Sequence, residues 1–336
     1  MRSKQVHENR QYVMYVMEAL LYCGQQGIAI CGHRETEKVG SFISVGNYLN
    51  LLKLQSRHTD FLRKRLGSGP KNASLLGHYY QISMLQVLAE SVLGYIKDEV
   101  RAARYYSIVT DKTKHISNKE QMTSVICYAL KGVVHERFIS YTHCEELNAA
   151  ALQNISTRFS LLREIIPNYA AAASCIEATE KTLANLKCKD QWDKIWDEAA
   201  VFAQAHKPIL THYGNDEECI SSELLTAPTV LCKVSSLTCI NQVYSHLNEV
   251  NECFPLLLEA LQIAMTIGVT TATAERTFSS LRRLKTFLRS TILQKRLNHL
   301  SLLRIKKDLS AKLWDNLGDV VLKFSPEHKN SRMVLQ

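Results

Sequence analysis

The sequence lacks a long apolar run and an apolar leader. Its longest nearly apolar stretch, residues 254–269, is 16 residues long and contains Glu259 and Gln262. A membrane-spanning helix needs about 20 predominantly apolar residues. Residues 1–11 are polar and charged, without the apolar segment of a secretory signal. We therefore expect a soluble protein inside the cell, without contact with a membrane.

Paired metal-binding and nucleotide-binding motifs are also absent. The ten cysteines include no Cys-x-x-Cys pair, and no Cys/His set has zinc-finger spacing. The sequence contains no P-loop, no Gly-x-Gly-x-x-Gly, no Gly-x-Ser-x-Gly and no His-Glu-x-x-His. We therefore expect reduced thiols, no bound metal and no cofactor.

The positive charge of the chain is confined to one segment. The net charge is +9, and residues 276–307 alone hold ten basic residues and no acidic one. Such a stripe either contacts phosphates or is a solvated helix face. Both readings stay open at this point.

Apolar periodicity predicts helices over residues 9–24, 44–66 and 74–104, with a break at residues 67–70. The pattern then changes to β-branched and aromatic runs. Strands are predicted over residues 105–111, 122–130 and 133–141, with a turn at Lys131-Gly132. The short links predict an antiparallel meander, and the absence of a fourth strand predicts an exposed sheet edge.

The last third of the chain is mostly helical in its pattern. A short strand is predicted at residues 263–269, and a helix follows from about residue 270. A capping box formed by Thr291 and Gln294 is expected to open a second helix. A last amphipathic piece covers residues 313–324, and the final dozen residues are expected to be frayed.

Several blocks of this sequence resemble hAT-superfamily transposases. Ala-Glu-Arg-Thr-Phe-Ser at 274–279, Leu-Arg-Ser-Thr at 288–291 and Arg-Leu-Asn at 296–298 resemble the C-terminal dimerisation region of that superfamily. Gly-His-Arg-Glu at 32–35 and residues 40–52 and 105–121 look like the N-terminal domain of hAT-derived zinc-finger MYM-type and THAP-repressor-like proteins.

The resemblance implies an RNase H-like fold in which three acidic residues hold two divalent metals, because paired cations need bridging carboxylates to activate a nucleophile. By the match, Asp111 is the first acid and Glu275 the last. Each has an ordinary alternative: Asp111 could cap the end of a strand, and Glu275 could favour the positive end of its helix.

The middle acid of the family has no counterpart here. It follows a fourth strand, usually in an Asp-Gly-Ala sequence, and the chain after Tyr141 shows neither feature. An active transposase or nuclease would need an unrecognised third acid, for which the candidates are Glu145, Glu146 and Glu164. We expect instead a degenerate transposase that is not an enzyme, with Asp111 and Glu275 as inactive remnants.

The expected fold is α+β and mostly helical, with a truncated RNase H-like core. The predicted segments are a helical N-terminal region (1–104), the partial core (105–165), a helical segment and connector (166–236), the dimerisation region (237–310) and a tail (311–336).

The expected function is self-association through the C-terminal region, with itself or a related hAT-derived protein as partner and the nucleus as the favoured location over the cytoplasm. The residues expected to dimerise form one apolar stripe on each of two helices: Phe278, Leu281, Leu284, Leu288, Leu297, Leu300 and Leu303.

The alternative function is that of a DNA-binding repressor. No recognition finger precedes the core, so contact with DNA would be weak, non-specific and sensitive to salt. The residues expected to make it are the basic ones of the same two helices: Arg282, Arg283, Lys285, Arg289, Lys295 and Arg296.

Overall fold

The computed structural model describes residues 2–31, 46–69, 74–114, 120–143, 222–223, 225–227, 230–231, 240–267, 272–285, 292–328 and 333–335. Residues 144–221, which include Glu145, Glu146 and Glu164, lie outside these ranges, as do Leu288 and Arg289.

Four helices precede the sheet: α1 (Arg2–Gln26), α2 (Asn47–His58), α3 (Asp60–Ser68) and α4 (His78–Ala103). Helix α1 ends where Gly27 adopts a φ of 67°. This left-handed conformation favours glycine. It lets the amide of Ile28 donate to the carbonyl of Cys23 at 2.9 Å. A side chain at this position would also collide with Arg304, so Gly27 allows α1 and a C-terminal helix to meet.

The sheet is the predicted antiparallel meander, with order β1-β2-β3. Its strands are β1 (Ser107–Lys114), β2 (Glu120–Leu130) and β3 (Val133–His143). Lys131 and Gly132, both with positive φ, form the two-residue turn between β2 and β3. Asp111 pairs with Thr123 and lies inside β1, three residues before its end. The fold class predicted from the sequence is therefore confirmed.

The C-terminal half adds α11 (Ile240–Asn248), η2 (Asn251–Cys253), α12 (Pro255–Thr266), α13 (Ala272–Leu284), α14 (Gln294–Ile305), α15 (Lys307–Asp315), α16 (Leu317–Phe324) and η4 (Ser325–His328). The strand predicted at 263–269 is wrong, because α12 continues to Thr266. Helix α12 starts at Pro255, whose fixed φ suits the first helical position.

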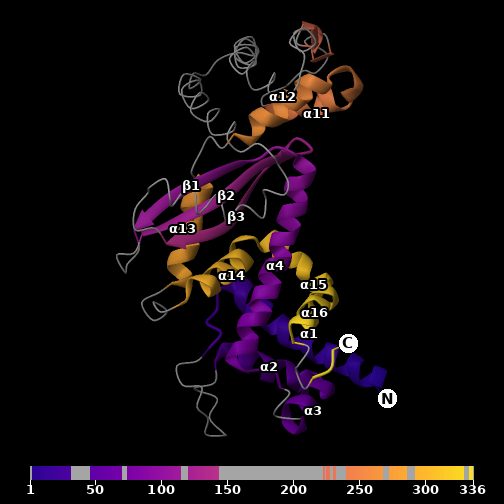
Figure 1. The fold of residues 1–336 in the computed structure, drawn as a ribbon, viewed down its shortest axis with the longest axis vertical. Coiled ribbons are helices and arrows are strands. Elements are labelled where there is room, and N and C mark those ends of the chain that lie inside the picture. The colour runs from indigo at the N-terminus through magenta and orange to yellow at the C-terminus, as the bar shows by residue number, and fades with distance from the viewer. Residues whose placement is uncertain are drawn as a thin grey trace.

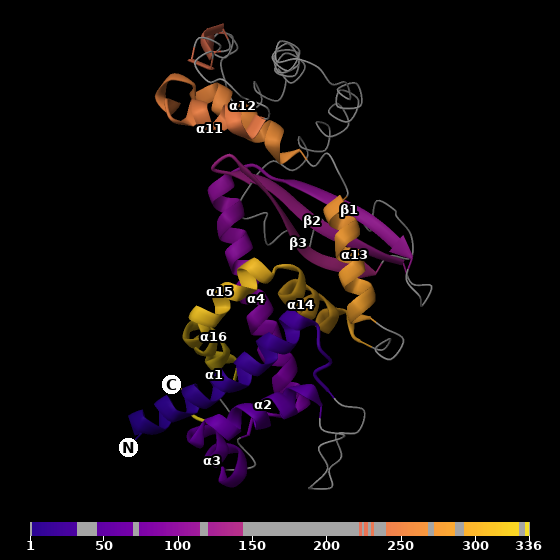
Figure 2. The same cartoon turned by 180° about the vertical axis from the view of Figure 1, so that it is seen from behind.

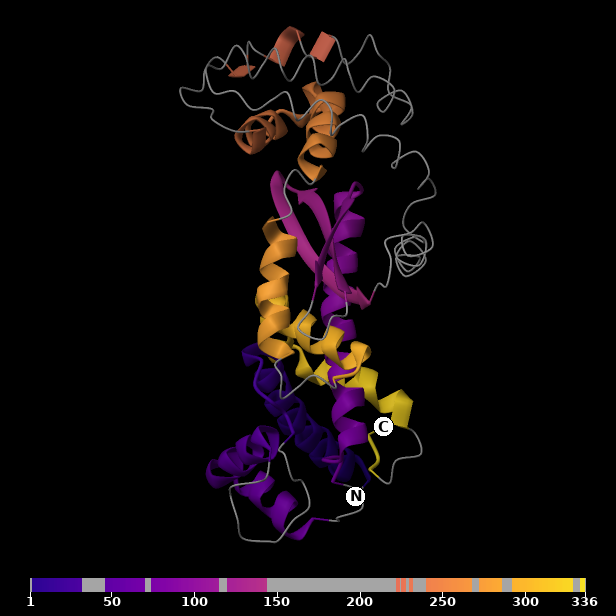
Figure 3. The same cartoon turned by 90° about the vertical axis from the view of Figure 1, so that its left-hand side faces the viewer.

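Helices cover both faces of the sheet. Helix α13 lies along one face, and α4 extends from the other face into the helical part of the molecule (Figures 1 and 3). Helices α11 and α12 lie beyond the β2–β3 turn (Figure 2) and form a second apolar cluster that includes Ala129 of β2. The main core joins α1–α4, the sheet and α13–α16. The division of the chain into the five predicted segments stays a prediction.

Helix α14 covers part of the sheet edge that the sequence predicted to be exposed. The side-chain amide of Asn298 accepts from the main-chain N–H of Tyr141 at 3.0 Å and donates to its carbonyl at 3.1 Å. Gln294 donates to the same carbonyl at 2.9 Å. The two side-chain amides thus form hydrogen bonds with the main chain of β3 that a neighbouring strand would otherwise form.

The capping box predicted for α14 is wrong. The helix starts at Gln294 with Leu293 as its N-cap, and no side chain caps it. Gln294 is engaged by the sheet rather than by the helix start.

The end of the chain is docked, in contrast to the predicted fraying. Met333 and Leu335 are buried. Asn9 and Arg10 of α1 donate to the carbonyls of Val334 and Leu335 at 2.9 and 2.8 Å. The two termini therefore lie close together (Figure 1). Over the described ranges, every helix falls short of the length and apolar character required to cross a bilayer.

Candidate functional site

The two expected acids lie on elements that pack against each other. Helix α13 contacts all three strands. It carries the exposed Glu275 in its first turn, and the half-buried Asp111 lies on β1. Within the described ranges, no group of three His, Cys, Asp or Glu side chains could hold a metal ion. The described residues thus supply two carboxylates of the implied set, which does not fit a two-metal centre, and we derive no reaction through one.

The block at residues 274–279 anchors α13 to the sheet. The hydroxyls of Thr277 and Thr123 are 3.0 Å apart, and the hydroxyl of Tyr141 donates to the carbonyl of Thr277. The ring of Phe278 stacks on that of Tyr141, with centroids 6.4 Å apart. These buried contacts hold Glu275 at the exposed start of the helix. The sequence pattern identified Thr277 and Phe278, but no local signal pointed to Thr123 and Tyr141.

The apolar residues predicted to dimerise are buried within their own chain. The described ones belong to the main core together with residues of α1, α4 and the sheet: Phe278, Leu281, Leu284, Leu297, Leu300 and Leu303. Leu288 is outside the described residues. An amphipathic stripe has the same pattern whether it faces another subunit or the same chain, and the sequence alone could not separate these cases. The role of these residues at an interface stays a prediction.

The basic residues predicted to contact DNA differ in their exposure. Arg282, Arg283 and Lys295 are exposed, whereas Lys285 is buried. Arg296 is half-buried and donates to the sulfur of Cys31 at 3.3 Å. Arg289 is outside the described residues. The described members of this set are therefore divided between the surface and the interior, and their contact with DNA stays a prediction.

An ionic network centred on the buried Arg137 joins the sheet to α4 and α15. Arg137 of β3 forms an ion pair with Glu99 of α4 at 3.0 Å and another with Asp308 of α15. The hydroxyl of Tyr128 donates to the Glu99 carboxylate. Burial and that carboxylate raise the pKa of Tyr128. Burial alone would raise the pKa of Asp308, but the hydrogen bond and the charge of Arg137 lower it.

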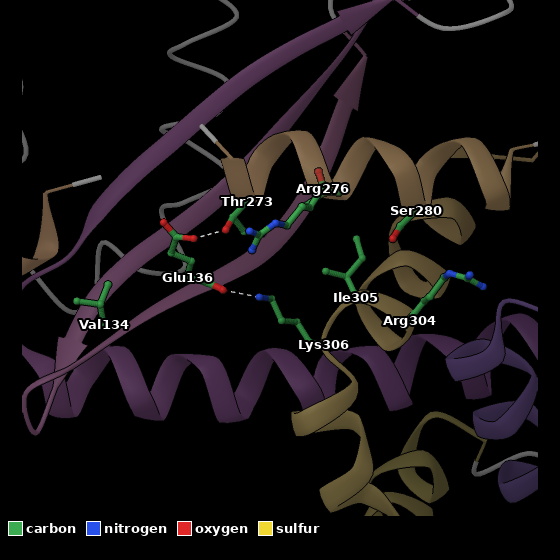
Figure 4. A pocket seen from close by; sticks show the side chains of 9 residues that line it. Val134, Glu136, Thr273, Arg276, Ser280, Arg304, Ile305 and Lys306 are labelled. Atoms are coloured by element: carbon green, nitrogen blue, oxygen red, sulfur yellow. Dashed lines mark hydrogen bonds between the residues drawn. The ribbon is translucent and has the colours of Figure 1, made fainter. Parts of the chain in front are cut away.

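A cavity of about 640 Å³ lies between β3, α13 and the end of α14. Arg276 and Ser280 line it from α13, and Arg304 and Lys306 line it from the other side. The hydroxyl of Thr273 and the ammonium of Lys306 donate to the carboxylate and the main-chain carbonyl of Glu136, respectively (Figure 4).

The surroundings of two cations at this cavity lower their pKa values. Burial, reinforced by the charge of Arg137, lowers the pKa of Lys306 to about 8, although Asp308, Glu136 and Glu99 act in the opposite direction. Burial and the neighbouring charge of Arg283 lower the pKa of Arg304. No local motif marks Arg276, Arg304 and Lys306 as a site, because only the fold brings them together.

The fold and these contacts define a mostly helical α+β protein with a truncated RNase-like core. A family model described as "ZMYM1/FAM200, RNase-like domain" matches residues 1–165. A second, described as "hAT family C-terminal dimerisation region", matches residues 233–309. Together they cover most of the chain. The chain therefore belongs to the hAT-superfamily transposase-derived proteins, as its sequence blocks predicted.

Two curated relatives match part of the chain. The human "52 kDa repressor of the inhibitor of the protein kinase" is 25% identical over 136 residues, which are 40% of this chain and 18% of that protein. Its mouse counterpart is 26% identical over 120 residues, which are 35% of this chain and 16% of that protein. This chain thus spans less than a fifth of either relative. No solved structure matches it.

Proposed function

We propose that this chain is a non-catalytic, transposase-derived regulatory protein that associates with itself or with related hAT-derived proteins through its C-terminal region. The match of residues 233–309 to a dimerisation region supports it. The word "repressor" in the names of both relatives supports a regulatory role and a nuclear location.

The outward charges of the C-terminal region suggest how two copies would meet. Residues 240–267 contain three acidic residues and no lysine or arginine. Glu249 and Glu252 are exposed there, next to the exposed Val250. Helices α13 and α14 instead expose basic residues, among them Arg282 and Arg283. Opposite potentials of this kind attract each other and set the register of an interface.

In the arrangement that we propose, α11–α12 of one subunit faces α13–α14 of its partner. A two-fold axis would form this contact twice, because each copy offers both surfaces. A stable dimer of this kind needs a total buried area on the order of 1,000 Å² or more. The apolar stripe residues would stay in the core of each subunit.

Charge reversal tests this interface. Light scattering on the full chain should show a dimer. The Glu249→Lys/Glu252→Lys variant should raise the dissociation constant of this dimer at least about tenfold, which corresponds to roughly 1.4 kcal/mol. Adding Arg282→Glu/Arg283→Glu should restore much of the affinity. The control is Glu8→Lys/Asp319→Lys, which changes the net charge equally at exposed positions outside the region. A wild-type monomer at micromolar concentration, or a control that dissociates equally, would refute the arrangement.

The absence of catalysis is tested separately. We expect the chain to leave supercoiled plasmid intact in Mg²⁺ or Mn²⁺, because two carboxylates cannot fix two metals. An agarose-gel nicking assay measures this, with Asp111→Ala as the matched variant. Nicking that disappears in Asp111→Ala would show an active enzyme and contradict the proposal.

A further inference from the structure

Lys306 is a buried cation without a carboxylate at ion-pair distance among the described residues. Its side chain is only 7% exposed, and its ammonium donates to the main-chain carbonyl of Glu136. None of the ion pairs within the described ranges includes it. An ammonium has three protons to donate. A buried charge is costly unless an opposite charge compensates it, so the site favours an anion that reaches Lys306 from the cavity.

Two guanidinium groups line the same cavity. Arg276 points from α13 toward Glu136 and Thr273, and Arg304 extends on the other side of Ile305 (Figure 4). Neither arginine takes part in an ion pair of the described residues. Arg304 donates to the carbonyl of Gln26 at 2.7 Å, which holds it beside α1. The described residues that line the cavity thus include three cations and one carboxylate, that of Glu136.

The lining also offers neutral donors and an apolar wall. The hydroxyl of Ser280 lines the cavity, whereas that of Thr273 is taken up by Glu136. Val134 and Ile305 add apolar surface. The volume of about 640 Å³ exceeds what one inorganic ion needs and falls in the range of about 300–1,000 Å³ typical of small-molecule sites.

From this arrangement we infer that the cavity binds a small organic phosphate, with its phosphate group at Arg276, Ser280 and Lys306 and its apolar part against Val134 and Ile305. Planar guanidinium groups bind phosphate oxygens in pairs, and an ammonium adds a point charge. The basic lining and the spare donors favour a phosphate over a neutral ligand. The inference is independent of self-association.

Calorimetric titration of the full chain with inorganic pyrophosphate and with adenosine diphosphate tests the site. Both should bind saturably at one site per chain. Adenosine diphosphate should bind more tightly than pyrophosphate, because its nucleoside part reaches the apolar wall. Arg276→Gln and Lys306→Met should each weaken binding about tenfold or more. Lys323→Gln, which removes an exposed charge from α16, should leave binding unchanged.

Thermal unfolding separates loss of the site from loss of the fold. Without ligand, Lys306→Met should melt at or above the wild-type temperature, because it removes a buried charge while keeping a similar volume. Three results would overturn the inference. They are unchanged pyrophosphate binding in Lys306→Met, equal weakening in Lys323→Gln, and binding of a single-stranded oligonucleotide without any binding of the two small phosphates.

Discussion

Substitution of Arg137 by methionine is expected to lower the free energy of unfolding by about 2–3 kcal/mol, because it leaves the half-buried Glu99 with only the exposed Lys312, 3.8 Å away, as its cation. The side chain of Glu99 is 18% exposed, and Arg137 lies 3.0 Å from its carboxylate. Arg137 also binds Asp308, so the substitution disconnects β3 from both α4 and α15. Methionine fills a similar volume, which makes the lost charge the main change.

Urea unfolding measures the effect, and the chain contains a matched control. Arg101 and Asp98 form an ion pair at 3.3 Å, but their side chains are 52% and 72% exposed. Arg101→Met should therefore cost at most about 1 kcal/mol. In the double variant Arg137→Met/Glu99→Gln, the buried charge is absent, and much of the lost stability should return. Equal costs for the two arginine substitutions would contradict this account of the network.

The same network predicts a dependence on acid pH. The pKa of Asp308 is lowered in the fold, with Arg137 overcoming the effect of burial. A lowered carboxyl pKa contributes stability above its unfolded value, and that contribution is lost as the pH falls through the folded value. The difference in stability between the wild type and Arg137→Met should therefore shrink in this acid range.

Local patterns in the sequence were sufficient for the sheet. Alternating β-branched residues and the Lys131-Gly132 turn depend on neighbours a few positions apart, and the meander follows from them. The end of α12 was mispredicted because residues 263–269 are apolar without a clear period. A short apolar run fits either a strand or a buried helix.

Contacts over long sequence distances could not be predicted. Gln294 looked like the second half of a capping box, yet it donates to the carbonyl of Tyr141, 153 positions earlier. The last dozen residues were expected to fray as chain ends commonly do, yet Asn9 donates to the carbonyl of Val334 across 325 positions. In both cases a tertiary partner determines the local structure.

The candidate site shows the same division. Sequence blocks placed Asp111 and Glu275 on the strand and helix that carry them. The cavity at Lys306 draws on β3, α13 and α14. No local motif signals such a site, because Glu136 of β3 and Thr273 of α13 are 137 positions apart.

The Leu281→Ala variant tests whether the apolar stripe packs within the subunit or between two subunits. Leu281 is 1% exposed and packs in the main core. Removing a buried leucine side chain costs about 2–5 kcal/mol, through lost burial and the cavity that remains. We expect this loss in the subunit itself, so unfolding should shift equally at low and high protein concentration. The part of the protein that stays folded should associate with unchanged affinity.

The charge variant Glu249→Lys/Glu252→Lys should show the opposite behaviour. Both side chains are exposed, and surface substitutions usually change stability by at most about 0.5 kcal/mol. Light scattering and urea unfolding on both variants therefore separate two kinds of effect. If Leu281→Ala were as stable as the wild type but monomeric, the stripe would have to lie between subunits. In that case, burial in a subunit interface rather than within the chain would explain the leucine pattern.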